Sequence, residues 1–180
     1  MTSRELEEYR ALRETIRERG TARIWVVLAG LTGWAALAIA TTALAVLPIA
    51  TFLPLLVLAA TFEIVFSLHT GVERVGRYIQ VFFEDEAAGG WEHEAMAYGR
   101  AFPGSGADPL FGFYFWLATL FNFIPALLAQ PAPIEWMVVG AVHALLIVRI
   151  AVARRQAARQ RAIDLERFER LKATTTTGRA

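Results

Sequence analysis

The chain has 180 residues, of which 56% are apolar, with no cysteine and a formal net charge of +1. A mean hydropathy of +0.41 is typical of a polytopic membrane protein rather than of a soluble domain. Without cysteine there is no disulfide, no thiolate nucleophile and no cysteine-based metal site.

The N-terminal segment predicts a charged amphipathic helix over residues 3–19. Thr2 and Glu5 have capping-box spacing, and apolar residues recur behind them at three- and four-residue steps. Gly20 is the expected break before the first membrane span, because glycine is a poor helix former.

Two membrane spans are predicted next, since residues 24–62 hold no Asp, Glu, Lys, Arg or His. About 20 helical residues cross the roughly 30 Å hydrocarbon core, so we expect spans over 24–45 and 50–68. A tight turn at Pro48 and Pro54 would join them. Small residues on one face of the first span predict a close helix contact, and they are Ala29, Gly33, Ala36, Ala40 and Ala43.

The second span is expected to continue beyond the membrane as a helix over 70–84. An acidic loop, a short helix over 91–102 and a glycine-rich turn would follow. Asp108 and Pro109 then predict the N-cap and first residue of a third span over 110–129.

The C-terminal part predicts a turn at 130–133, a fourth span over 134–152 and a basic helix over 154–172. Residues 174–180 are expected to form a disordered tail.

Orientation follows from Lys and Arg, which favour the cytoplasmic side. All 18 lie in the N-terminal segment, the 63–109 connection and the C-terminal segment. We therefore expect an all-α, integral membrane four-helix bundle with amphipathic cytoplasmic terminal helices, forming one domain over 1–173. Its expected location is the bacterial cytoplasmic (inner) membrane, with both termini in the cytoplasm.

Glu63 is the acidic residue expected within the bilayer. Counting about 1.5 Å per residue places Glu63 about 20 Å, and Arg149 about 22 Å, below the outer surface. Three interpretations stay open: an ion pair with Arg149, a titrating carboxylate that couples proton or cation movement, or snorkelling of Glu63 to the interface.

Asn122 and His143 are expected at a similar depth in the third and fourth spans. Either they form an interhelical hydrogen bond, or His143 relays protons to Glu63. Haem ligation by His69 and His143 is excluded by a depth difference of roughly 15 Å.

No catalytic residue, metal or cofactor is predicted. The segment Glu92-His93-Glu94 is expected in a solvated acidic region, because neighbours in a helix point in different directions and cannot all bind one metal. No motif of a hydrolase, metalloprotease or nucleotide-binding loop is present.

Two surfaces are predicted to meet partners. A basic cluster suits the anionic lipid headgroups of the inner leaflet, and it consists of Arg154, Arg155, Arg159 and Arg161. A cytoplasmic interaction surface is predicted where aromatic and arginine residues alternate with acids, and it consists of Arg74, Arg77, Tyr78, Phe82, Glu84, Trp91 and Glu92. The alternative is that this second set only seals the bundle against the terminal helices.

Residues 73–84, followed by Trp91 and Glu92, resemble a segment of small uncharacterised bacterial polytopic membrane proteins with a GRYIQVFFE…WE connection. The resemblance covers about twenty residues. It implies that the connection between the second and third spans is a designed feature. The resemblance does not indicate which activity the protein has.

The functional prediction is an accessory or interaction protein of the membrane, whose partner is a cytoplasmic protein or a second copy of the chain. A small oligomeric transporter or channel coupled through Glu63 and His143 is the main alternative. A membrane enzyme that uses the acidic connection is a third, without support from a motif, and no nucleic-acid partner is expected.

Overall fold

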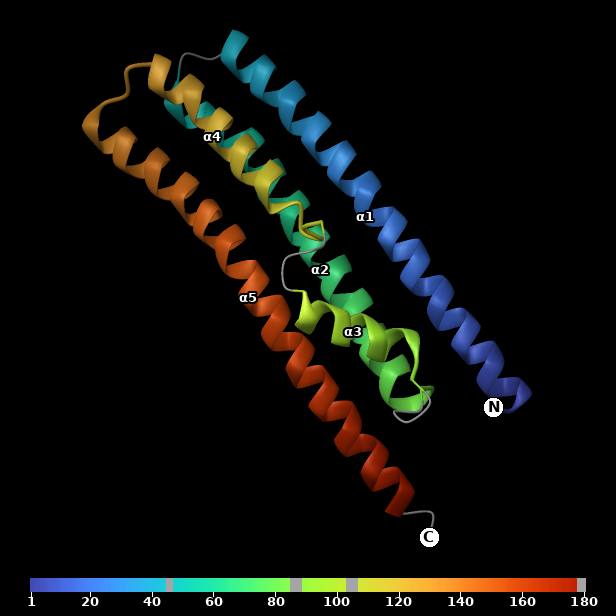
Figure 1. The fold of residues 1–180 in the computed structure, drawn as a ribbon. Coiled ribbons are helices and arrows are strands. Elements are labelled where there is room, and N and C mark those ends of the chain that lie inside the picture. Colours follow the sequence, from blue (N-terminus) through green and yellow to red (C-terminus); the bar gives the residue numbers. More distant parts are fainter. Residues whose placement is uncertain (45–46, 85–88, 103–106, 178–180) are drawn as a thin grey trace. The chain divides into compact units, whose positions relative to one another are not determined.

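A computed structural model describes residues 1–44, 47–84, 89–102 and 107–177. Within these residues the chain is all-helical, with five α-helices, one short 3-10 helix and no strand. In chain order (Figure 1) the elements are α1 (Ser3–Leu44), η1 (Pro48–Thr51), α2 (Phe52–Phe82), α3 (Trp91–Ala101), α4 (Gly112–Leu128) and α5 (Pro133–Thr177). The predicted acidic loop at 85–88 and glycine-rich turn at 103–106 lie outside the described residues.

Three helices, α1, α2 and α5, are long and apolar enough to cross a membrane. They have 42, 31 and 45 residues. Since about 20 residues span the hydrocarbon core, each is long enough for a span and a polar extension. The apolar helix α4 is shorter, with 17 residues.

The chain divides into two compact units. The apolar unit comprises Ala22–Ser67 and Leu110–Arg155, and the polar unit comprises Met1–Thr21, Leu68–Pro109 and Gln156–Ala180. The single domain over 1–173 stays a prediction.

The core of the apolar unit is built by side chains from four helices. Val27 of α1, Phe62 of α2, Phe115 of α4 and Ile150 of α5 are all buried in it. The rings of Phe62 and Phe115 meet edge to face with their centroids 5.3 Å apart. Many other large apolar side chains of this unit are exposed, as on a surface that faces lipid, for example Trp25, Ile39, Leu56, Phe113, Leu128 and Leu145.

The start of α1 confirms the predicted capping box. The Thr2 backbone N–H donates to Glu5 Oε2 at 2.6 Å, and the Glu5 N–H donates to Thr2 Oγ1 at 3.3 Å. The expected break at Gly20 is wrong, because α1 runs unbroken from Ser3 to Leu44. One glycine costs a helix only about 1 kcal/mol relative to alanine, which the helix-forming residues around it offset.

The predicted small-residue face of α1 packs little within this chain. Of its members only Gly33 is even partly buried, while Ala29, Ala36, Ala40 and Ala43 are exposed. Packing of α1 instead uses Val27 and Gly30, one turn apart.

The third span begins later than predicted, at Gly112 rather than after Asp108-Pro109. Phe111 precedes α4 in the left-handed conformation with φ 53°. Leu110 is buried in the apolar core and Phe111 packs against it, so tertiary packing sets the start of α4.

The fourth span and the basic helix are one element, because α5 is continuous to Thr177. Residues 174–177, expected in a tail, are its last turn, where the Thr174 and Thr175 hydroxyls donate to the Leu171 carbonyl. The rest of the predicted tail, 178–180, lies outside the described residues. Likewise, the predicted helix over 70–84 is the end of α2.

Candidate functional site

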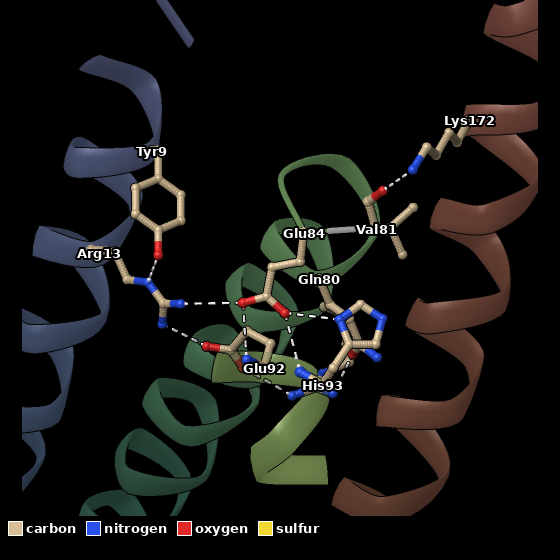
Figure 2. A network of polar contacts seen from close by, with 9 residues as sticks. Tyr9, Arg13, Gln80, Val81, Glu84, Glu92, His93 and Lys172 are labelled. Atoms are coloured by element: carbon tan, nitrogen blue, oxygen red, sulfur yellow. Dashed lines mark hydrogen bonds and ion pairs between the residues drawn. The ribbon is translucent and has the colours of Figure 1, made fainter. Parts of the chain in front are cut away.

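A polar network holds the start of α3 in the polar unit (Figure 2). The N-cap of α3 is Gly90, which has no side chain to cap the first N–H groups. Glu84, just beyond the end of α2, supplies that acceptor: its Oε1 accepts from the Glu92 N–H at 2.9 Å, and its Oε2 from the His93 N–H at 3.1 Å. A carboxylate is favourable here because the N-terminus of a helix is electropositive.

Gly90 makes room for this carboxylate. A Cβ on residue 90 would lie 2.6 Å from the Cγ and from Oε2 of Glu84. That is closer than real side chains approach, so a larger residue would displace the carboxylate from the helix end.

Two basic side chains also face Glu84. His93 Nδ1 lies 2.9 Å from Oε2, and Arg13 Nη2 lies 3.5 Å from Oε1. Burial alone would raise the pKa of Glu84, but the N–H of Glu92 and the ring and N–H of His93 outweigh it and lower the pKa.

Glu92 is the second acid of the network and is 7% exposed. Its Oε1 accepts from Arg13 Nη1 at 2.7 Å, and its Oε2 accepts from Arg77 Nη2 at 3.2 Å. Arg77 also donates to Gln80 Oε1 at 2.7 Å. Burial lowers the pKa of Arg77, although Glu73 and Glu92 oppose this shift. Both acids are therefore matched by basic side chains from α1, α2 and α3.

The end of α2 is held by α5. Lys172 Nζ donates to the Val81 carbonyl at 2.5 Å, at a position where a helix leaves carbonyls without an internal partner. Beside this contact is an open cavity of about 320 Å³, lined by Gln80, Glu84 and His93 on one side and by Leu165, Glu169 and Lys172 on the other.

Aromatic contacts join α2 to both terminal helices within the polar unit. Tyr78 donates its hydroxyl proton to Glu8 Oε1 at 3.0 Å. The ring of Tyr78 lies 4.7 Å from Phe82 and 5.6 Å from Phe168, and Tyr9 lies 5.8 Å from Phe83. The aromatic residues of the connection thus pack against the terminal helices.

The structure divides the predicted interaction surface. Arg77, Glu84 and Glu92 lie inside the network, where they are not available to a partner. Tyr78 and Phe82 belong to the aromatic contacts, and Arg74 pairs with Asp164 at 3.1 Å. Of the predicted set, Trp91 is the most exposed, at 71%.

Sequence reasoning missed two exposed aromatic residues, one in the last turn of α3 and one just after it. Tyr98 and Phe102 are 58% and 57% exposed, and their rings lie 5.0 Å apart. Trp91, Ala95 and Tyr98 recur at four- and three-residue steps, so they share one face of α3, and Phe102 follows at its C-cap. That spacing was visible in the sequence, but it would ordinarily have predicted a buried face.

The predicted pair of Glu63 and Arg149 is present in the apolar unit. Arg149 Nε and Nη2 each lie 2.8 Å from one carboxylate oxygen of Glu63, which makes the pair bidentate. The guanidinium also lies over the rings of Phe66 and Phe62, at 4.6 and 5.6 Å.

The predicted Asn122–His143 contact is also present. Asn122 Nδ2 lies 3.0 Å from His143 Nε2 and donates to the Thr51 carbonyl, while its Oδ1 accepts from Trp34 Nε1. His143 Nδ1 lies 2.8 Å from the Val139 carbonyl, so Nδ1 carries the proton and Nε2 accepts. Both ring nitrogens are occupied, which suits a structural role.

In the basic cluster that follows the fourth span, Arg161 forms an ion pair with α2. Arg161 Nε lies 2.6 Å from Glu73 Oε2, whereas Arg154, Arg155 and Arg159 are exposed. Headgroup binding by this cluster stays a prediction.

The network has the chemistry of a structural contact that holds the start of α3 in place. Its carboxylates are taken up by N–H groups and guanidinium groups, and in the described part of the chain no three His, Asp or Glu side chains are placed to hold a metal. Comparison with protein-family models, curated proteins and solved structures gave no match.

Proposed function

We propose that this chain is an accessory protein of the bacterial cytoplasmic membrane that binds a protein partner through the outer face of α3. In this proposal α1, α2, α4 and α5 cross the bilayer as a four-helix bundle, and both termini and the polar unit are cytoplasmic.

The orientation of α3 is the observation that carries the proposal. A surface helix of a soluble assembly normally buries its apolar face and exposes its polar one. In α3 the acid Glu92 is buried against Arg13 and Arg77, while Trp91 and Tyr98 are exposed. Exposed aromatic residues above a rigid scaffold are the side chains that protein interfaces bury.

The geometry around Glu63 supports interaction over transport. A transport role needs a polar path to the carboxylate. The groove that reaches Glu63 is lined otherwise by apolar residues and Arg149, and Arg149 already holds both oxygens.

The test compares an outward with an inward aromatic residue. A photo-crosslinking amino acid at Tyr98, in cells that make the full chain, should give a discrete protein adduct that Trp91→Ala abolishes. The melting temperature of Trp91→Ala in mild detergent should equal that of the wild type.

Tyr78→Ala is the matched control, because Tyr78 contacts Glu8 and Phe168 internally. It should lower the melting temperature. Adducts formed only with lipid, or a Trp91→Ala protein as unstable as Tyr78→Ala, would overturn the proposal.

A further inference from the structure

An apolar groove runs between α2 and α5 in the apolar unit and ends at the Glu63–Arg149 pair. Its volume is about 450 Å³, and its walls include Leu56, Ala59, Val142 and Leu145. Leu56 and Val142 each lie seven residues, or two helical turns, before the charged residue of their own helix, so they share its face.

The ion pair at the end of this groove is only partly covered. The side chain of Glu63 is 51% exposed and that of Arg149 is 28% exposed. Their exposed neighbours are apolar, such as Ile64 and Val148. In a bilayer an ion pair with one bare edge is costly, because no water solvates it there.

A second copy of this chain fits both features of the groove. Two copies inserted in the same direction are related by a two-fold axis along the membrane normal. The bidentate contact holds Glu63 and Arg149 at the same depth in the membrane. The two-fold axis therefore sets Glu63 of each copy opposite the partner's Arg149. Four charges then alternate in sign, and the apolar walls cover one another.

A lipid acyl chain satisfies only half of these features. It would fill the apolar part of the groove and leave the charged edge bare. We therefore propose that the groove between α2 and α5 is a two-fold interface between two copies of this chain, centred on the Glu63–Arg149 pair.

Cysteine crosslinking tests the interface directly, because the chain has no native cysteine. Full-length Leu56→Cys protein carrying a tag is mixed with untagged Val142→Cys protein in vesicles of phosphatidylethanolamine and phosphatidylglycerol. Oxidation should give a covalent tagged–untagged dimer. The matched control replaces Val142→Cys with Ile39→Cys, on the exposed face of α1, and should give none.

The charges are tested by diluting the protein in the same vesicles. The Glu63→Gln/Arg149→Met protein leaves no unpaired charge, so it should fold. Its association constant for dimer formation should be about tenfold lower than that of the wild type. Equal crosslinking at Val142 and Ile39 would overturn the proposal. So would a wild-type protein that stays monomeric while a photoreactive fatty acid labels Leu56.

Discussion

Glu84 caps a helix to which it does not belong. It lies beyond the end of α2, yet its two oxygens accept from the first N–H groups of α3, at a position where Gly90 can offer none. One residue therefore couples the end of one helix to the start of the next.

This coupling predicts a pH-dependent effect of Glu84→Gln. At pH 7 the variant should be less stable by about 1–2 kcal/mol, because an amide caps more weakly and carries no charge for Arg13 or the helix N-terminus. The pKa of Glu84 is lowered by folding. Its contribution is therefore complete above the unfolded-state pKa of about 4.3 and is lost as the pH falls through the folded-state value.

Melting in mild detergent at pH 7 and at successively lower pH measures this difference. The gap between wild type and Glu84→Gln should close on acidification. Glu7→Gln, at an exposed position on α1, is the control and should match the wild type throughout. Equal melting temperatures of wild type and Glu84→Gln at pH 7 would remove the capping role.

A contact fixed by helix geometry could be predicted from the sequence, whereas a contact fixed by the tertiary fold could not. The Glu63–Arg149 pair was predictable because the rise of a helix places both residues at one depth within long apolar spans. The pair of Arg13 and Glu92 is 79 residues apart in the chain, and no periodicity relates them. Glu92, expected in a solvated region, is thus found buried, because only the tertiary fold brings Arg13 and Arg77 to it.

At the scale of elements, the contact of α1 with α2 depends on one glycine. A Cβ on Gly30 would lie 2.8 Å from Thr61 Cβ and closer still to the rest of that side chain. Thr61 donates its hydroxyl proton to the Val57 carbonyl at 2.7 Å, which fixes its rotamer. The two helices must separate if residue 30 acquires a side chain.

Gly30→Ala is therefore expected to destabilise the protein by about 1–3 kcal/mol, the usual cost of overpacking. Gly33→Ala is the matched control, because its Cβ would meet only Val57 Cγ1 at 4.0 Å. It should be neutral, or stabilising by up to about 1 kcal/mol, since alanine is the better helix former. Unfolding in mixed micelles measures both, and equal effects would contradict a close contact at Gly30.

The helices were predictable as elements, whereas several of their limits were not. Long uncharged runs and the capping box at Thr2 and Glu5 gave correct assignments because both signals are local. The break at Gly20 was wrong, because one weak helix former does not by itself end a helix. The start of α4 depends on how Leu110 and Phe111 pack, which no local signal contains.

For the whole molecule, the number of crossings depends on α4. Its 17 residues extend about 25 Å at 1.5 Å per residue, slightly less than the hydrocarbon core. If only α1, α2 and α5 crossed, the termini would lie on opposite sides, and the basic end of α5 would be exported. If α4 also crosses, every Lys and Arg outside the spans lies on one side, and Arg149 lies within α5 beside Glu63. The charge distribution therefore favours four crossings.

Single-cysteine labelling in intact cells tests this topology, because the chain has no cysteine of its own. Cysteines at Ile49 and Ala132 should react with an impermeant maleimide, whereas those at Ser3, Glu94 and Thr175 should react only after the membrane is opened. Glu94 and Ala132 lie on either side of α4, so their comparison reports on that helix alone. Labelling of both from the outside, or protection of both, would mean that α4 does not cross. The charge distribution predicts opposite results at these two positions, because one crossing by a short helix costs less than exporting the basic C-terminal segment of α5.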